Sequence, residues 1–347
     1  MKLKKNSENP ILSPNPNNSW ENLAVCNPGA WYEDGKFYLL YRAAGDDEDH
    51  LIHFGLAVSD DGFTFKRMSD QPVFSPSSDG PDAGCVEDAR IVKFDDYYYV
   101  TYAYRPFPPG QYWTMAPDQV NVANHGQNAP AVVNKNIANT GLAITKDFKS
   151  FKRLGRMTET VLDDRDVILF PEKINGKYAL LNRPKEWIGP DYGCKYPAIW
   201  LTLSDDMMNW DYSTSVMVIQ GEEAWEEKIG GSTPPLYTED GWLTLYHGVD
   251  NKGIYRVGAM LLDLENPAKV LAKTKDFIME PEFDYENEGL YNGCVFPTGN
   301  VIVDNTLYVY YGAADQYCGV ATCKVDELVG FIKSNSRERA NQEVVNA

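Results

Sequence analysis

Side chains that bind metals or act as nucleophiles are scarce in this chain. Its 347 residues include six cysteines and four histidines. The cysteines form no C-x-x-C pair, which predicts reduced, buried thiols and argues against a disulfide framework or a zinc site. The histidines are too scattered for a local metal motif. We expect His50 and His125 in solvated loops, His53 in a structural position, and no metal.

Several motifs are missing as well. No G-x-S-x-G elbow occurs, which argues against a serine triad. No glycine-rich segment has the spacing of a P-loop or of a dinucleotide-binding loop. No apolar run reaches about 18 residues, and no apolar segment follows the basic N-terminus. The sequence therefore predicts a cytoplasmic protein that neither spans a membrane nor is secreted.

Positive charge is in short supply too. The chain has 32 Lys and Arg against 50 Asp and Glu, a formal net charge of −18. A surface that follows a phosphate backbone needs a basic face, so nucleic acid is not expected as a partner. Most of the acidic side chains are expected on a solvated surface.

An aromatic-rich repeat is what the chain has in abundance. Five times, an apolar or Pro-containing segment passes through a short turn into a second strand pattern that ends in a polar or charged residue. The turns read DG, DD, NG, DG and DN between β-branched and aromatic runs, the signal of a hairpin. Hairpins are therefore predicted at 28–43, 87–105, 170–184, 233–248 and 296–315.

A second strand-rich phrase follows each hairpin, more loosely in the last two copies. It predicts two further strands in each unit, at 53–68, 140–154, 198–212, 255–271 and 318–332. Five four-stranded antiparallel units indicate an all-β fold, a five-bladed β-propeller, as one domain over 1–347. A long interval between the second and third turns marks an insertion at about 106–137, and about 333–347 is expected to be a polar C-terminal tail that ends the last blade.

In a propeller the innermost strands line a central funnel. The starts of the units supply the first set of candidates for it, and the ends of the second strands supply a second set. Buried charges offset their desolvation only when they are well paired, so a ring of carboxylates and cations indicates a polar binding site. For any one residue, a salt bridge between blades is the alternative. The two sets are Asn27, Glu87, Asp88, Glu172 and Pro234–Pro235, and Arg42, Arg105, Arg183, His247 and Asp315.

Most of the tryptophans and tyrosines are expected in sheet packing, because aromatic residues are enriched in strands. Tyr112 and Trp113 are different, since they lie in the Pro- and Asn-rich insertion. A long excursion from a rigid repeat often covers a site or forms an oligomer contact. We therefore expect these two side chains to present flat faces to a sugar ring.

Eleven blocks of sequence, in order along nearly the whole chain, resemble glycoside hydrolase family 130. The most specific are VEDARI (86–91), DRDVILFPEKINGKYALLNRP (164–184) and YHGVD (246–250), accompanied by NPGA (27–30), YRA (41–43), WEEKIG (225–230), EPEFDYENEG (280–289) and YYGAAD (310–315). The family consists mainly of β-mannoside phosphorylases. The resemblance implies reversible phosphorolysis with inversion and a carbohydrate substrate. It also implies inorganic phosphate as co-substrate, and no other cofactor.

The resemblance also implies roles for single residues. Asp88 corresponds to the catalytic acid, which protonates the glycosidic oxygen through the O3 hydroxyl of the mannosyl unit while phosphate attacks C1. Guanidinium forks and an imidazole that adds a charged donor suit phosphate oxygens. The implied phosphate ligands are Arg165, Arg183 and His247, with Lys228 as a further candidate. Asn27, Arg42, Glu282 and Asp315 fall in blocks that hold the sugar.

Two alternative functions, the bond that is cleaved and the oligomeric state stay open at this point. The segment after the VEDARI strand and the WEEKIG block depart from the simplest family pattern, and Glu226 or Glu227 would serve as base in an inverting β-1,2-mannosidase that uses water. A non-catalytic carbohydrate-binding propeller is a further possibility. The bond cleaved is β-1,2 in mannobiose or oligomannan, or β-1,4 to glucose or N-acetylglucosamine. A homo-oligomer is compatible with the sequence.

Overall fold

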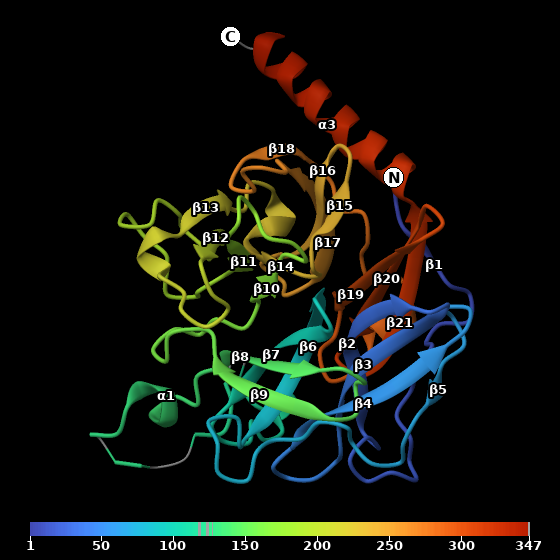
Figure 1. Cartoon of the computed structure of the whole chain (residues 1–347), viewed down its shortest axis with the longest axis vertical. Coiled ribbons are helices and arrows are strands. Elements are labelled where there is room, and N and C mark those ends of the chain that lie inside the picture. The colour runs from blue at the N-terminus through green and yellow to red at the C-terminus, as the bar shows by residue number, and fades with distance from the viewer. Residues whose placement is uncertain (117–118, 123–124, 127, 346–347) are drawn as a thin grey trace.

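The computed structural model describes the chain apart from residues 117–118, 123–124, 127 and 346–347 and the side chains from residue 336 onward. Strands dominate, as predicted, and they fall in chain order into five antiparallel groups. In Figure 1 the first strand of each group lies toward the middle of the view and the outermost strand toward the periphery. The repeat in the sequence is therefore a repeat of structure.

The first three groups follow the predicted hairpins. The first group contains β2 (Ala24–Glu33), β3 (Lys36–Ala44), β4 (Ile52–Ser59) and β5 (Lys66–Arg67). The second contains β6 (Cys85–Phe94), β7 (Tyr97–Arg105), β8 (Asn139–Thr145) and β9 (Phe151–Arg156). The third contains β10 (Ile168–Leu169), β11 (Tyr178–Asn182), β12 (Ile199–Ser204) and β13 (Val216–Ile219). A parallel bridge between Ile52 and Cys85 joins the first two groups into one sheet.

The fourth group begins with a broken strand. Its strands are β14 (Lys228–Gly231), β15 (Leu236–Thr238), β16 (Gly241–Val249), β17 (Tyr255–Leu262) and β18 (Val270–Lys273). Both β14 and β15 pair with β16. Pro234 and Pro235 lie in the gap, and prolines have no N–H to donate to a ladder.

The last group joins the two ends of the chain. β19 (Val295–Val303), β20 (Thr306–Ala313) and β21 (Tyr317–Lys324) are completed by β1 (Lys4–Lys5), which pairs with β21. The fourth strand predicted within 318–332 is therefore wrong. That segment instead enters the helix α3 (Val325–Val345), which begins with Asp326 and Glu327, the charges that a helix N-terminus favours.

Short helices lie in the connections between strands. They are η1 (Tyr112–Thr114), α1 (Ala131–Asn134), η2 (Tyr212–Thr214), η3 (Ala224–Glu226) and α2 (Asp284–Asn287). Leu328, Val329 and Ile332 of α3 are buried in the core of the last two groups. Beyond them α3 extends away from the body of the molecule at the top of Figure 1.

The predicted hairpin turns are present. Asp34 and Gly35 both have positive φ, at 51° and 74°, between β2 and β3. Two residues with φ > 0 make the turn that matches the twist of paired strands, and only Gly and Asn or Asp adopt it readily. Asp304 and Asn305, with φ of 47° and 61°, repeat the arrangement between β19 and β20. Local turn chemistry therefore fixed the hairpin positions.

The first strands of three groups meet closely. β2, β6 and β19 each contain a β-bulge, at Cys26/Gly29, Glu87/Arg90 and Pro297/Gly299. A Cβ on Gly29 would lie 2.8 Å from the carbonyl oxygen of Ala89, and one on Gly299 would lie 2.5 Å from the backbone nitrogen of Ala30. Glycine therefore allows these strands to approach backbone to backbone, and bulges there redirect the side chains that follow.

A triad built on a buried carboxylate and a buried tyrosine recurs in four of the five groups, and we call these the outer triads. In each, a carboxylate ahead of the first strand accepts a hydrogen bond from a tyrosine on the second strand and pairs with a cation. The four are Glu21–Tyr41–Arg67, Asp82–Tyr102–Arg153, Glu226–Tyr246–Lys273 and Glu286–Tyr311–Lys5. In the same order, the tyrosine hydroxyl lies 3.0, 3.0, 2.6 and 2.7 Å from a carboxylate oxygen. The nitrogen of the cation lies 2.8, 2.7, 2.9 and 2.7 Å from a carboxylate oxygen.

The third group carries a variant of this triad without a cation. Asp164 accepts hydrogen bonds from Asn182 Nδ2 and from the backbone N–H of Arg183, both at 3.1 Å. Burial raises the pKa of Asp164 to about 7, because the hydrogen bonds and Arg183 do not offset the desolvation. Asn182, in the place of a tyrosine, in turn accepts from Thr202 Oγ1 at 3.4 Å.

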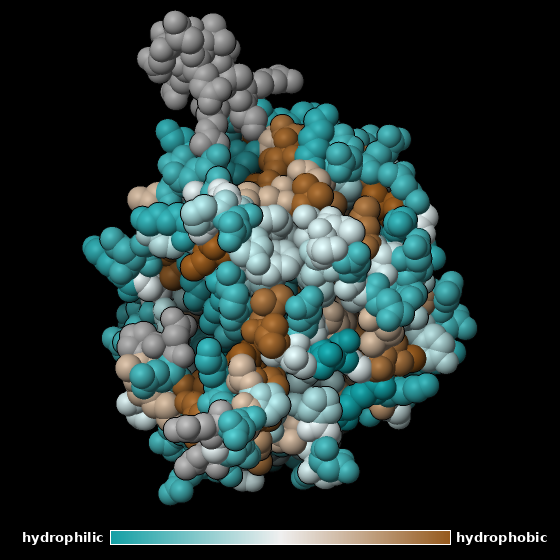
Figure 2. Space-filling model, turned by 90° about the vertical axis from the view of Figure 1, so that its left-hand side faces the viewer, coloured by the Kyte–Doolittle hydropathy of each residue, from teal (hydrophilic) through white to brown (hydrophobic). Residues whose placement is uncertain are grey.

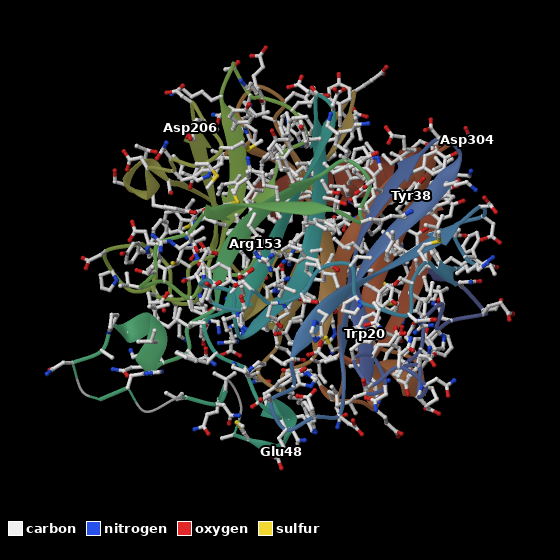
Figure 3. The ribbon with its side chains drawn as sticks, turned by 60° about the horizontal axis from the view of Figure 1, so that its bottom comes forward. Trp20, Tyr38, Glu48, Arg153, Asp206 and Asp304 are labelled. Atoms are coloured by element: carbon white, nitrogen blue, oxygen red, sulfur yellow. The ribbon has the colours of Figure 1, made fainter. Side chains whose placement is uncertain are left out.

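The surface agrees with the charge of the chain. In Figure 3 Glu48, Asp206 and Asp304 lie at the margins of the molecule, and all three are exposed. In Figure 2 apolar side chains lie in several small areas separated by hydrophilic ones. Among the described residues, no helix combines the length and the apolar character that a membrane span requires.

The cysteines and histidines have the following places. All six cysteines are free thiols, and all except the half-buried Cys323 are buried. His125 is exposed, and His53 contacts Ser75 Oγ at 3.0 Å in a structural position, both as predicted. The prediction of a solvated His50 is wrong. Its ring is buried and lies edge-on to Tyr112, and burial lowers its pKa to about 4.

Candidate active site

The bulge in β6 positions Asp88. Successive side chains of a regular strand point to opposite faces of the sheet. The bulge between Glu87 and Arg90, where Asp88 has a φ of 60°, breaks this alternation. Glu87 and Asp88 consequently both reach the same guanidinium, Arg42 Nη1, at 3.1 and 3.3 Å. Both carboxylates are 6% exposed.

The bulge in β2 places Asn27 against the same carboxylate. Asn27 has a φ of 45°, and its Nδ2 donates to Asp88 Oδ1 at 2.7 Å. Its Oδ1 is buried without a hydrogen-bond donor among the described residues. A Cβ at Gly312 of β20 would lie 1.7 Å from that oxygen, so glycine is required there. Two bulged strands thus hold a carboxyl group and an amide side by side.

The environment of Asp88 favours its protonated form. Burial raises its pKa and the neighbouring charge of Glu87 adds to the effect, while Arg42, Arg90 and the Asn27 hydrogen bond oppose it. Glu87 shifts the other way. Burial raises its pKa, but the positive charges of Arg42, Arg105 and Arg165 outweigh burial and hold it below its usual value. The pKa values of two adjacent carboxyl groups are thus shifted in opposite directions, as in acid–base sites.

The insertion returns to this place through Tyr112. The Tyr112 hydroxyl accepts from Arg42 Nη2 at 3.3 Å and donates to Asp315 Oδ2 at 3.1 Å. Trp113 packs edge-on against the ring of His50, with 4.7 Å between ring centroids. The linked residues form what we call the acid cluster: Asn27, Arg42, Glu87, Asp88, Tyr112 and Asp315. All six were candidates from the sequence, Glu87 as a funnel residue, and Trp113 packs against the rings of His50 and Tyr112.

A second group of side chains, which we call the anion cluster, contains the predicted phosphate ligands Arg165, Arg183 and His247 together with Asp163, Asp166 and Lys185. Arg165 makes a two-pronged contact with Asp163, at 3.0 and 2.7 Å. Lys185 Nζ reaches the same carboxylate at 3.2 Å. Arg183 contacts Asp166 Oδ2 through Nε at 3.0 Å and through Nη2.

One nitrogen of Arg183 is left over. The side chain is buried, and its Nη1 has no hydrogen-bond acceptor among the described residues. A buried guanidinium N–H without a partner loses its hydration without compensation. Asp166 holds the other two nitrogens and thereby fixes the direction of Nη1. The arrangement suits an anion that supplies the missing acceptor, as a phosphate oxygen does.

Positive charge depresses the pKa of two basic groups here. Arg165 and burial lower the pKa of Lys185 to about 7, although Asp163 opposes them. Burial, with Arg183 and Lys228, lowers the pKa of His247 to about 3 despite Asp166 at 3.7 Å. The expectation of a charged imidazole is therefore wrong, because a buried ring beside Arg183 loses its proton. His247 is a neutral group at this site.

Arg90 connects the two clusters. Its Nη1 donates to the backbone carbonyls of Asp88, at 3.0 Å, and of Arg165, at 3.2 Å. Its Nη2 lies 3.4 Å from Asp166 Oδ1. The side chain is among the largest that are fully buried. A single guanidinium thus ties the acid cluster to the anion cluster.

The remaining predicted site residues lie elsewhere or contribute less directly. Lys228, half-buried on β14, acts on His247 and Lys185 through its charge. Glu282 pairs with Lys5 at 2.9 Å, its side chain is 54% exposed, and its backbone N–H donates to Glu286. These contacts do not support its prediction as a sugar ligand. Glu172, expected at the funnel, is exposed.

Glu226 is engaged in an outer triad. Its two oxygens accept from Lys273, Tyr246 and the backbone N–H groups of Glu222 and Glu223, at 2.6–3.1 Å. Donors already occupy both oxygens of this carboxylate, which leaves it little capacity to accept a proton from water. Glu227 is half-buried where η3 passes into β14. Neither arrangement resembles the second carboxylate of an acid–base pair.

Sequence reasoning missed three residues that organise the site: Arg90, Asp166 and Lys185. The signal was present for two of them. Asp166 follows Arg165 by one position within the same block. Lys185 follows Arg183 by two positions, directly after the end of that block. Arg90 lies in the VEDARI block, but no local pattern indicates that its side chain reaches both clusters.

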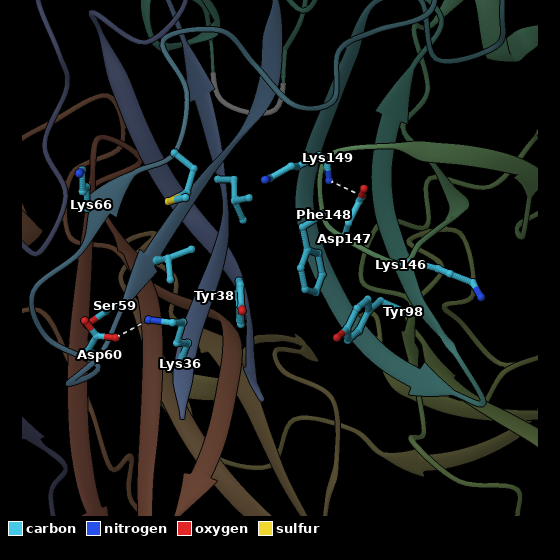
Figure 4. Close-up of a pocket in the computed structure, with 13 residues that line it drawn as sticks. Lys36, Tyr38, Ser59, Asp60, Lys66, Tyr98, Lys146, Asp147, Phe148 and Lys149 are labelled. Carbon is cyan, nitrogen blue, oxygen red and sulfur yellow. Dashed lines mark hydrogen bonds and ion pairs between the residues drawn. The ribbon is translucent and has the colours of Figure 1, made fainter. Parts of the chain in front are cut away.

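A cavity of about 510 Å³ lies away from both clusters (Figure 4). It is lined by lysines and aromatic residues of the first two groups, among them Lys66, Lys149 and Tyr38. Lys36 is already paired with Asp60 at 2.7 Å, and Asp147 accepts the backbone N–H of Lys149. Its lining shares no residue with the acid or anion cluster. Chemistry, rather than cavity size, therefore locates the candidate site.

Comparisons with known proteins find relatives that match over almost the whole chain. The 1,2-β-oligomannan phosphorylase of Thermoanaerobacter sp. (strain X514) is 38% identical over 337 residues, covering 94% of this chain and 99% of the relative. The β-1,2-mannobiose phosphorylase of the same organism is 37% identical over 340 residues, with the same coverage. A solved complex of the Listeria innocua β-1,2-mannobiose phosphorylase with β-1,2-mannobiose superposes with a TM-score of 0.77 at 26% identity, covering 96% of this chain and all of that one.

The match to a family extends over almost the whole molecule. The family model described as β-1,4-mannooligosaccharide phosphorylase covers residues 2–334. That range contains both clusters and all five groups of strands. The chain belongs to glycoside hydrolase family 130.

Proposed function

We propose that this chain is an inverting β-mannoside phosphorylase that acts on β-1,2-linked mannobiose or oligomannan. The products are α-mannose 1-phosphate and a shortened sugar. One observation supports the proposal above all: a buried carboxyl group that favours its protonated form lies one guanidinium away from a cationic cluster with an unpartnered Arg183 Nη1. Phosphorolysis needs a proton donor and a bound anion, and this arrangement offers both.

Asp88 is the proton donor in this proposal. The C1–O bond of the mannoside breaks as the Asp88 proton passes to the leaving oxygen, directly or through the O3 hydroxyl of the mannosyl unit. A general acid must be protonated at the working pH, and burial of Asp88 favours that form. Asn27 and Arg42 fix the carboxyl group from two other strands. The donor is therefore held in place before substrate arrives.

Arg183 and Arg165 bind the phosphate that attacks C1. A new C1–O–P bond forms on the face opposite the leaving group, which inverts the anomeric centre. Because phosphate is itself the nucleophile, no second carboxylate is needed to activate water. Arginines suit this task because their N–H groups match pairs of phosphate oxygens. The contacts of Glu226 with Lys273 and Tyr246 further favour phosphorolysis over hydrolysis.

The choice of the β-1,2 linkage rests on the relatives. The two proteins that match at 38% and 37% identity over 94% of this chain both act on β-1,2 mannosides by their names. The family model carries a β-1,4 description, which fits the family as a whole. We therefore place the β-1,2 substrates first and the β-1,4 mannosides of glucose or N-acetylglucosamine second.

The architecture belongs to the same proposal. Five antiparallel groups in chain order, with their first strands toward the middle of Figure 1 and β1 completing the last group, support a single-domain five-bladed β-propeller. The acid cluster then lies at the axis, where β2, β6 and β19 meet. The cytoplasmic location, the absence of a cofactor and a homo-oligomeric state stay predictions from the sequence.

Product analysis tests the function. The purified protein is incubated with β-1,2-mannobiose and, separately, with mannosyl-β-1,4-glucose, each with and without inorganic phosphate. We expect α-mannose 1-phosphate from β-1,2-mannobiose only when phosphate is present. Release of free mannose without phosphate would overturn the proposal in favour of a mannosidase. No turnover of any mannoside, with retained binding, would indicate a carbohydrate-binding protein.

A further inference from the structure

We propose that Glu87 is a positioning residue for the reaction: it holds the Arg42 guanidinium so that Asp88 remains available as the proton donor. The inference rests on the proposed function, because it assigns Glu87 a task in the step that Asp88 performs. It concerns a residue to which neither the sequence blocks nor the comparisons give a role.

The geometry of the β6 bulge carries the inference. Without the bulge, Glu87 and Asp88 would point to opposite faces of the sheet. With it, both reach Arg42 Nη1, and Glu87 Oε2 lies closer than Asp88 Oδ1, at 3.1 against 3.3 Å. The bulge therefore places a second carboxylate where it competes with the acid for one cation. A regular strand with a single carboxylate would leave that cation to Asp88 alone.

The surroundings of Glu87 make it the stronger partner for positive charge. Arg42 on β3, Arg105 on β7 and Arg165 ahead of β10 all act on it, as does His50 from the loop between β3 and β4. Within its own strand, Cys85 Sγ lies 4.0 Å from Oε1. Glu87 is thus the carboxylate on which the cations of three groups of strands converge.

Asp88 meets fewer compensating groups. Arg42 is its nearest cation, Arg90 donates to its backbone carbonyl, and Asn27 is a neutral donor to its side chain. Buried Cys26 and Cys294 lie near enough for Asp88 to affect their titration. Farther along the cluster, Asp315 accepts a hydrogen bond from the Tyr112 hydroxyl. After burial, the charge of Glu87 is the largest of the effects that raise the pKa of Asp88.

The expected consequence follows from the signs of these charges. An ionised Glu87 repels a negative charge on Asp88 and satisfies Arg42, so the pKa of Asp88 stays raised. Replacing Glu87 with Gln removes the repulsion and leaves Arg42 to pair with Asp88. Both changes favour ionised Asp88 and lower its pKa. The proton donor would then be lost at a lower pH.

The test is the pH profile of phosphorolysis in Glu87→Gln. The alkaline limb of kcat/KM reports the acid of the free enzyme. We expect this limb to move to lower pH by about one unit relative to wild type. Glu87→Asp, which keeps the charge, should move it less. Glu33→Gln is the matched control, because Glu33 is paired with Lys93 and Tyr98 on neighbouring strands and lies outside both clusters. Its limb should coincide with that of wild type.

A limb that stays in place in Glu87→Gln, with kcat/KM lowered equally at every pH, would overturn the inference and make Glu87 a structural residue. The proposed function would survive that result if wild type still forms mannose 1-phosphate. Carbon-13 NMR of wild type, assigned with Asp88→Asn, provides a measurement that needs no folded Glu87 variant. Glu87 should ionise at lower pH than Asp88, and the reverse order would equally overturn the inference.

Discussion

The outer triads and the two inner clusters contain the same kinds of chemical group but differ in how completely those groups are paired. In the triad of Glu226, every contact is completed within the protein, by Lys273, Tyr246 and two backbone N–H groups. In the inner clusters, Arg183 Nη1 and Asn27 Oδ1 are buried without partners among the described residues. Unsatisfied buried groups cost stability. The comparison teaches that completeness of pairing, more than burial or charge, separates the triad of Glu226 from the two inner clusters.

The sharpest way to break this comparison uses two aspartates of the same group of strands. Asp82 belongs to an outer triad and Asp88 to the acid cluster. We expect Asp88→Asn to lower kcat about 10³-fold, because it removes the general acid, while the unfolding free energy changes little. Asp82→Asn should keep turnover and lose about 1–3 kcal/mol of stability, because Tyr102 and Arg153 lose a charged partner.

Parallel rate assays and denaturant titrations of the two variants measure this difference. The comparison fails if both variants lose rate and stability together.

Breaking an outer triad from the cation side gives the next largest effect. Lys273→Met leaves the buried Glu226 without its cation, which should lower the unfolding free energy by about 3 kcal/mol. The double variant Lys273→Met/Glu226→Gln should recover part of that loss, because no uncompensated charge remains. Urea unfolding of both variants and of Glu226→Gln completes the cycle. A single variant as stable as wild type would mean that the triad is not a coupled unit.

Arg183 sharpens the other side of the comparison. Arg183→Ala should lower phosphorolysis about 10²-fold at low phosphate and raise the KM for phosphate far more than that for the sugar. Arg67→Ala, in an outer triad, is the matched arginine control and should leave both KM values unchanged. Steady-state kinetics with phosphate and mannoside varied in turn give the result. Equal changes in both KM values would place the anion elsewhere.

The variant triad of the third group predicts a smaller, pH-dependent effect. The pKa of Asp164 is raised to about 7 in the folded chain. Between the unfolded pKa of about 3.9 and pH 7, Asp164 is ionised in the unfolded chain but still protonated in the folded chain. The free energy of unfolding therefore decreases as pH rises through this range. Asp164→Asn should remove that slope. Its stability relative to wild type should be better at pH 8 than at pH 5, as measured by thermal or urea unfolding.

The difference between pH 5 and pH 8 in the relative stability of Asp164→Asn would be absent if Asp164 were ionised in the folded protein at pH 5. Asp164→Asn would then be equally destabilised at both pH values. Comparison with Asp205→Asn, an exposed aspartate beside β12, controls for the general effect of pH on the fold.

Local chemistry explains what could be predicted from the sequence. The hairpin turns depend on neighbouring residues such as Asp34 and Gly35, so their positions were predicted correctly. The pairing of β1 with β21 joins residues more than 300 positions apart, and nothing local indicates it. The helix α3 replaces the strand expected after residue 324, and the acidic Asp326 and Glu327 in its first turn are a local signal that was missed.

The site was predictable to the degree that sequence blocks fix single positions. Asp88, Arg183 and Tyr112 lie where they were expected, within the two clusters. Glu226 and Glu282 lie outside both clusters, where Lys273 and Lys5 pair with them. In the sequence, a glutamate of a cluster and a glutamate near an outer triad look alike, because the lysine partner is distant along the chain. The charge state of His247 depends on burial beside Arg183, which no pattern in the sequence reveals.

The most direct test of the account is a crystal structure of the protein with inorganic phosphate and β-1,2-mannobiose, using Asp88→Asn to prevent turnover. The account predicts a phosphate oxygen within hydrogen-bond distance of Arg183 Nη1, and the glycosidic oxygen on the side of residue 88. Phosphate bound away from Arg183 and Arg165, or a sugar that leaves residue 88 out of contact, would contradict it.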